Sequence, residues 1–173
     1  MKNILKARKS GFTLVELLIV IIIIAILAGM MMLATGAATD TAEATRVIND
    51  LRTAKAAGIL IYMDEGQTWR WLSAGGVANA ATAASFDRYM DRPLFSGERV
   101  YRLVFQLNVP VDVGNGNTET RTLMGFNLVN NTSVTPSVRD KLVRNAERVG
   151  LYNRDGSIYN NSSGNEAVYM ILH

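Results

Sequence analysis

The 173-residue sequence contains no cysteine, and its one histidine, His173, is the last residue. It can therefore form no disulfide framework, zinc–thiolate site or iron–sulfur cluster, and it offers no thiol nucleophile. Because catalysis usually needs a poised base, nucleophile or metal, we expect no catalytic residue, no bound metal and no cofactor. Three prolines and fourteen glycines are too few for a collagen-like or linker-dominated chain. With 49% hydrophobic and 19% charged residues, most of the chain should fold.

Acidic residues are absent from residues 1–11, which carry four basic side chains: Lys2, Lys6, Arg8 and Lys9. Residues 12–34 reverse this composition, since their only charged side chain is Glu16. At 1.5 Å per residue, a helix of this length spans about 34 Å, enough to cross a hydrocarbon core of about 30 Å. Basic residues before an apolar span hold the N-terminus in the cytoplasm. We therefore expect residues 35–173 to lie outside the membrane.

Three interpretations compete for the apolar segment: a cleaved secretory signal, a plain membrane anchor and a specialised segment. A secretory signal has an apolar region of about 7–15 residues before a small-residue cleavage site. Ala34-Thr35-Gly36 supplies small residues, but the apolar run before it is too long. A plain anchor leaves Glu16 unexplained, because an ionisable group inside a membrane span is costly and usually marks function.

The run KSGFTLVELLIV at residues 9–20 resembles the N-terminal signature of type IV pilins and of the related type II secretion pseudopilins. The resemblance implies that a prepilin peptidase cuts between Gly11 and Phe12 and methylates the new N-terminus at Phe12. It further implies that the retained helix holds the subunit in the inner membrane, where it meets the pilus assembly platform. The helix then forms the core of a helical homopolymer of identical subunits, which becomes a surface filament.

The resemblance divides the chain into four parts. Residues 1–11 are a leader that is removed, residues 12–34 are the membrane and filament-core half of the N-terminal helix, residues 35–64 are its amphipathic half, and residues 65–173 are a globular head. Loss of the leader leaves 14 basic against 15 acidic side chains, so the net side-chain charge changes from +3 to −1. The basic excess that would favour a polyanionic partner therefore belongs mainly to the leader.

Glu16 is the informative residue of the apolar run. A lone carboxylate in a medium of low dielectric must be protonated or find a positive partner. The resemblance implies that this partner is the Phe12 amine of a neighbouring subunit, which sets the register of assembly. Without the Gly-Phe motif, a Glu16 side chain idle in the headgroup layer would be the better interpretation.

Two departures from the family pattern concern proline and cysteine. Many pilins carry a proline near the position of Leu33, whereas here only Gly29 and Gly36 weaken the helix. The sequence leaves open whether the helix unwinds around residues 29–37. Without cysteine, strand pairing and packing must hold the C-terminal region.

Helical spacing continues after the apolar run, and we expect the helix to end near Gly66. Over residues 44–63 the apolar positions fall at steps of four and three: Val47, Leu51, Ala54, Gly58 and Ile61. This pattern predicts one long N-terminal helix whose second half packs on the head. Residues 67–84 are rich in glycine and alanine and are expected to form a connection.

From Arg99 onward, large apolar residues occur at every second position, and this alternation predicts a half-buried strand. The expected inward side chains are Tyr101, Leu103, Phe105, Leu107 and Val109. Residues 114–117 have turn composition and residues 118–129 provide a return strand, so we expect a hairpin. A short strand at 167–172 could close the sheet.

A second helix is expected to begin at Thr135-Pro136 and to stop at Gly150. Its apolar positions keep helical spacing: Val138, Leu142, Ala146 and Val149. The sequence therefore predicts an α+β fold of the type IV pilin kind. In it, a long N-terminal helix packs on a small antiparallel sheet, and an extra helix lies towards the C-terminus.

Three motifs suggest other functions. Trp69-Arg70-Trp71 invites a nucleic-acid interpretation, but two tryptophans that pack the connection onto the head are the better interpretation. The second helix has a basic face (Arg139, Lys141, Arg144 and Arg148), for which a solvated surface is the better interpretation and a contact with another subunit or with DNA the alternative. Residues 153–157 form a turn that resembles part of a calcium loop but lacks acids at both ends.

A filament subunit accounts for the leader, Glu16, the long helix and the α+β head together. We expect a pilin of a type IV pilus, and the sequence leaves open whether its filament serves cell adhesion, motility, DNA uptake or secretion. The alternatives are a pseudopilin of a type II secretion system and a minor pilin that binds DNA, although we do not expect nucleic acid as a partner. A glutamate at position 16 favours a subunit that can occupy any place along the filament.

Overall fold

The computed structural model describes residues 11–66, 76–95, 101–113, 117–129, 131–162 and 166–172. For residues 33–35 it describes the backbone alone. The elements in chain order are α1 (Leu14–Asp64), β1 (Gly76–Val77), α2 (Ala80–Arg88), β2 (Arg102–Asp112), β3 (Thr118–Asn127), α3 (Pro136–Val149) and β4 (Ala167–Ile171). The chain divides into two units, Met1–Thr39 and Asp40–His173. The architecture confirms the predicted α+β class.

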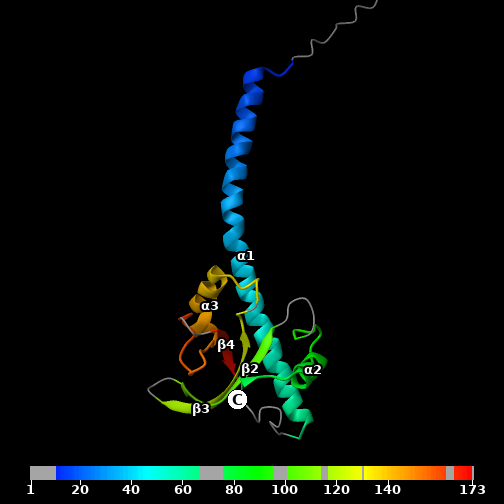
Figure 1. Ribbon diagram of the computed structural model, residues 1–173. Coiled ribbons are helices and arrows are strands. Elements are labelled where there is room, and N and C mark those ends of the chain that lie inside the picture. Colours follow the sequence, from blue (N-terminus) through cyan, green and yellow to red (C-terminus); the bar gives the residue numbers. More distant parts are fainter. Residues whose placement is uncertain are drawn as a thin grey trace, which may run out of the picture. The chain divides into compact units, whose positions relative to one another are not determined.

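The helix α1 is continuous over 51 residues, so neither Gly29 nor Gly36 interrupts it (Figure 1). Its large apolar side chains from Leu14 to Met32 are all exposed. Among the described residues, α1 is the one helix long and apolar enough to cross a membrane. An apolar surface of this size needs a lipid or protein environment, because water solvates it poorly.

The four strands form one antiparallel sheet in the order β1-β2-β3-β4 (Figure 1). The predicted hairpin is confirmed, since β2 pairs with β3 from Arg102↔Asn127 to Asp112↔Thr118. The expected final strand is β4, which pairs with β3. The turn expected at 114–117 lies mostly outside the described residues. The two-residue strand β1 was not predicted, because residues 76–77 carry no alternating pattern.

The second half of α1 packs on the sheet and on α3, within the unit Asp40–His173. Its predicted apolar stripe is confirmed, because all five positions are buried: Val47, Leu51, Ala54, Gly58 and Ile61. They lie in or beside a core that also contains Phe86 of α2, Phe105 of β2 and Phe126 of β3. Tyr101 stacks on Phe126 with a ring separation of 4.4 Å.

The prediction of which β2 side chains point towards α1 is wrong for the second half of the strand. Leu103 and Phe105 lie in the core that contains α1, whereas Val109 and Val111 belong to a second apolar cluster with Val104. The reason is a bulge, because the register with β3 shifts between Gln106 and Val109. An extra residue in one strand reverses the alternation of its side chains.

The connection expected over residues 67–84 is also wrong in part, because α2 begins at Ala80. Asn79 caps this helix, and its side-chain oxygen accepts a hydrogen bond of 2.8 Å from the Thr82 amide. Four of the first five residues of α2 are alanine, which is the best helix former. Phe86 then anchors the helix in the core.

The helix α3 has the predicted ends. The hydroxyl of Thr135 accepts a hydrogen bond from the Val138 amide, and Pro136 is the first helical residue. Gly150 closes the helix with φ of 75°, a left-handed conformation that suits glycine. Val138, Leu142 and Ala146 are buried, as the spacing predicts.

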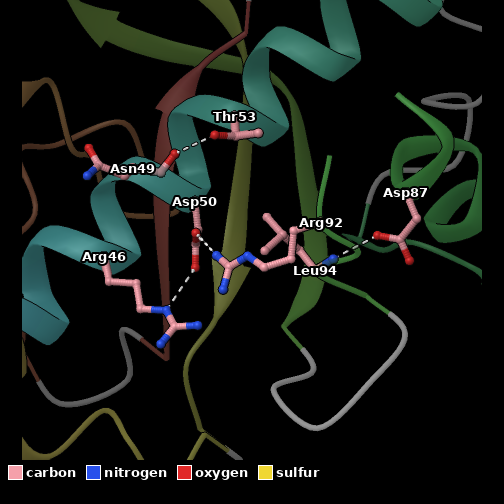
Figure 2. Close-up of polar contacts among 7 residues, drawn as sticks. All are labelled: Arg46, Asn49, Asp50, Thr53, Asp87, Arg92 and Leu94. Carbon is pink, nitrogen blue, oxygen red and sulfur yellow. Dashed lines mark hydrogen bonds and ion pairs between the residues drawn. The ribbon is translucent and has the colours of Figure 1, made fainter. Parts of the chain in front are cut away.

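A buried carboxylate ties the segment after α2 to α1 (Figure 2). Asp50 is 6% exposed, and Arg92 donates a hydrogen bond to its Oδ1. Arg46, one turn before it, places Nε 3.9 Å from Oδ2. The side chain of Asp87 holds the same segment in shape, because it accepts hydrogen bonds from the amides of Leu94 and Phe95. Buried charge is expected to be paired in this way.

Gly125 of β3 lies so close to β4 that a larger residue at this position should lower stability. A Cβ atom at Gly125 would lie 2.3 Å from the carbonyl oxygen of Val168 and 2.7 Å from Cδ1 of Tyr169. Gly125→Ala should therefore lower the free energy of unfolding by at least about 2 kcal/mol, because backbone must move. Urea unfolding of the detergent-solubilised chain measures this change.

Gly58→Ala is the matched comparison. The nearest atoms to its Cβ from outside its own helix turn would be side-chain atoms of Phe86 and Leu172, at 3.2 and 3.3 Å. Alanine also favours the helix by about 1 kcal/mol, so we expect a near-neutral result. Equal urea midpoints for the two variants would contradict the close approach of β3 and β4 at Gly125.

Candidate functional site

The start of α1 is the candidate functional site. Gly11, Phe12 and Thr13 lie outside the helix, which begins at Leu14. Gly11 is exposed and the Phe12 side chain is 89% exposed. The peptide bond between them therefore precedes the helix and joins two exposed residues.

Thr13 and Glu16 form a capping box at this helix start. Oε2 of Glu16 accepts hydrogen bonds from the amide of Thr13, at 2.8 Å, and from its hydroxyl, at 2.7 Å. In return, Oγ1 of Thr13 accepts a hydrogen bond of 3.2 Å from the Glu16 amide. The two side chains satisfy backbone donors that the first helical turn leaves without a partner. A carboxylate in the first turn is also favoured by the helix dipole.

The capping box is independent of the Gly11–Phe12 bond. All its atoms belong to Thr13 and Glu16, so a cut before Phe12 removes none of them. Both hydrogen bonds to the carboxylate end on Oε2, which leaves Oε1 of Glu16 without a hydrogen bond from the described residues. One carboxylate can therefore cap its own helix and accept a further donor.

Thr13 is the residue of this site that our sequence analysis missed. The signal was available, because a threonine followed three residues later by a glutamate and an apolar run is the pattern of a capping box. The resemblance alone implies only the amine of Phe12 as a partner for Glu16. The structure adds a partner on the same chain that does not depend on cleavage.

Thr13→Val tests the capping box without reference to function. Valine keeps the shape of the side chain but has no hydroxyl, so the start of α1 should lose about 1 kcal/mol of stability. We expect the Glu16 amide to exchange its hydrogen about fivefold faster in the detergent-solubilised chain, as measured by NMR. Thr13→Ser keeps the hydroxyl and should exchange like the natural chain. Unchanged exchange in Thr13→Val would contradict the capping role.

The loop at residues 153–157 is held by its own hydrogen bonds. Asp155 accepts hydrogen bonds from the hydroxyl and the amide of Ser157, and these bonds lower the pKa of Asp155. Asn153 is buried, and its side-chain nitrogen Nδ2 donates to the hydroxyl of Ser157, to the backbone carbonyl of Ile158 and to the side-chain oxygen of Asn160. Among the described residues, no three acidic or histidine side chains gather where they could hold a metal ion.

The basic face of α3 is partly engaged within the subunit. Arg139 donates to the carbonyl oxygen of Leu128 at 3.2 Å, and Arg148 donates to Oδ1 of Asn145 at 2.6 Å. Arg144 is exposed. The motif Trp69-Arg70-Trp71 lies outside the described residues, so its predicted packing stays a prediction.

Comparison with known families gives one match, at the candidate site. Residues 6–32 match the family model described as the prokaryotic N-terminal methylation motif. The matched stretch includes Gly11, Phe12, the capping box and the first part of α1. Searches of curated proteins and of solved structures find no match.

Proposed function

We propose that this chain, which carries the N-terminal signal of the prepilin and pseudopilin family, is a structural pilin that polymerises into a type IV pilus. The observation that carries the proposal is an exposed Gly11–Phe12 bond directly before a capped, continuous and apolar helix. A prepilin peptidase cuts this bond and methylates the amine of Phe12. The retained helix first anchors the subunit in the inner membrane and then enters the filament core.

The exposed half of α1 supports polymerisation. Its apolar side chains face outward from Leu14 to Met32. In a membrane they contact lipid, and in a filament they contact the same surface on other subunits. Transfer between these two apolar environments costs little hydrophobic free energy, so specific polar contacts must drive and align the assembly. Glu16 is the charged side chain available for this purpose within residues 12–34.

The four proposed segments follow from this function. Residues 1–11 are the leader, residues 12–34 the membrane and filament-core segment, residues 35–64 the amphipathic half of α1, and residues 65–173 the head. The cut lowers the net side-chain charge from +3 to −1, because the leader carries four basic and no acidic residues. The exported chain is thus close to neutral, which lowers the repulsion between identical subunits.

A pseudopilin of a type II secretion system is the second candidate. It would share the signal, the helix and Glu16, so the same observations support it. The described part of the chain shows no cluster of acidic groups for a metal, and the calcium loop common among pseudopilin shafts is not evident in the sequence. We therefore place the pilin first.

The location of the polymer distinguishes the two candidates. Cells are sheared, and the surface fraction and the envelope are assayed for this polypeptide by mass spectrometry and electron microscopy. A pilin should be abundant in micrometre-long surface fibres. If the polypeptide stays in the envelope while secretion depends on it, the pseudopilin is the correct function. A DNA-binding minor pilin would instead be scarce in the fibres and would bind DNA in a salt-sensitive way.

A further inference from the structure

A hollow between α1 and α3 gathers positive charge from both helices. Its volume is about 250 Å³, and all its lining residues belong to the unit Asp40–His173. Arg52 enters it from α1 and Arg148 from α3. A water molecule takes about 30 Å³ in the liquid, so the hollow has room for a small ion with several waters.

None of the described side chains that line the hollow is acidic. Its other polar members are Thr45, Asn49 and Asn145, while Ile48 and Val149 contribute apolar wall. The nearest carboxylate along α1 belongs to Asp50, which is already occupied by Arg92 and Arg46. Arg52 and Arg148 therefore line the same hollow, and no described acidic side chain lines it with them.

The two arginines differ in how they are held. Arg148 donates a hydrogen bond of 2.6 Å to Oδ1 of Asn145, and Nδ2 of Asn145 donates to the carbonyl oxygen of Lys141 at 2.8 Å. These bonds orient the guanidinium of Arg148, and no other hydrogen bond or ion pair between described residues engages it. No hydrogen bond or ion pair between described residues engages the side chain of Arg52.

We propose that Arg52 and Arg148 form a binding site for a phosphate group. A guanidinium presents planar donors that match the oxygens of phosphate, and each arginine can contact a different oxygen pair. Inorganic phosphate carries up to two negative charges and can neutralise both arginines, whereas a single carboxylate neutralises only one. A lipid phosphodiester carries one charge, but its two oxygens can each accept from a different guanidinium. Asn49 also lines the hollow and is exposed, and its side-chain amide can act as a further donor.

The sequence alone could not reveal this site. Arg52 lies off the apolar stripe of α1, and Arg148 belongs to the basic face of α3, 96 positions later. Only the packing of α3 beside α1 brings them to one hollow. The site is separate from the start of α1 and does not depend on polymerisation.

Calorimetric titration of the full chain in a neutral detergent with inorganic phosphate tests the proposal. We expect saturable binding that weakens at least tenfold in Arg52→Gln and in Arg148→Gln. Arg102→Gln is the matched control, since Arg102 is exposed on β2 and does not line the hollow. Circular dichroism of each variant checks that the head keeps its fold. Arg52→Lys should bind with intermediate affinity, because it keeps the charge but not the planar fork.

The source of the phosphate group is distinguished in nanodiscs. If phosphate binds more weakly in phosphatidylglycerol nanodiscs than in a detergent that contains no phosphate, and Arg102→Gln shows the same difference, a lipid headgroup competes for the site. Equal affinity in the two media identifies a soluble phosphate as the ligand. Either result upholds the site. Absence of saturable binding in the folded natural chain, or an equal loss in Arg102→Gln, would overturn it.

Discussion

A chain with Glu16→Ala is expected to be cut and methylated normally but to yield at least about tenfold fewer filaments. In the proposed polymer, the carboxylate of Glu16 pairs with the amine of Phe12 on a neighbouring subunit in an apolar core. Removal of one partner of a buried ion pair costs about 3–5 kcal/mol, and each 1.4 kcal/mol is a factor of ten. Filament counts by electron microscopy and the mass of the processed chain measure both parts of this result.

Glu16→Gln separates the two roles of this residue. Glutamine keeps an oxygen that can accept the hydrogen bond from the Thr13 amide, so the capping box survives. It has no charge, so the ion pair between subunits is lost. We expect Glu16→Gln to assemble as poorly as Glu16→Ala. If Glu16→Gln assembled normally while Glu16→Ala did not, capping would be the whole role of Glu16. Natural filament yield in Glu16→Ala would reject the assembly role.

A chain with Gly11→Val is expected to keep its leader and to form no filaments. Gly11 lies immediately before the proposed cut, in exposed backbone outside α1. A branched side chain at this place obstructs a peptidase that accepts glycine. The uncut chain retains four basic residues on the cytoplasmic side and has no free amine at Phe12, so the partner of Glu16 is missing. Intact mass and filament counts report the outcome.

Gly36→Val is the matched control for this prediction. Gly36 belongs to the small-residue stretch that would be the cleavage site if residues 12–34 were an ordinary secretory signal. An added Cβ at Gly36 meets no atom within 4 Å. We expect Gly36→Val to be cut at residue 11 like the natural chain. If Gly36→Val blocked processing and Gly11→Val did not, the secretory-signal interpretation would be correct.

Local sequence patterns were sufficient for the elements whose ends carry their own signals. Thr135, Pro136 and Gly150 define α3 because capping depends on neighbouring residues alone. The apolar stripe of α1 and the two long strands of the hairpin also follow from periodicity. The long helix was predictable over both of its halves, since the apolar and the amphipathic parts each keep helical spacing.

Other features depend on contacts between distant residues. The pairing of Asp50 with Arg92 joins positions that are 42 residues apart, and no spacing rule connects them. The bulge in β2 places Asn108 at φ of 55° and turns Val109 to the opposite face, although the alternating pattern runs through this point without a break. The short helix α2 was not predicted, because its alanine-rich sequence shows no clear apolar period. Its large apolar side chain, Phe86, packs in a core built by residues from other elements.

The candidate site is a contiguous stretch of sequence, so a local motif can point to it, and its proposed roles stay predictions. Gly11, Phe12 and Glu16 lie within six positions, and the spacing of Thr13 and Glu16 is itself a known signal. The hydroxyl contact shows that Glu16 has a partner in the isolated subunit. A carboxylate that is already oriented by its own helix loses less conformational entropy when a second subunit binds it.

Mass analysis of the N-terminal peptide from purified filaments tests the central claim most directly. The proposed function requires a chain that begins with N-methylated Phe12 and continues into Thr13 and α1. A polypeptide that begins at Met1 would contradict processing at the signal. A polypeptide that begins at or near Gly36 would show that residues 12–34 are removed, which contradicts an assembly through the first half of α1.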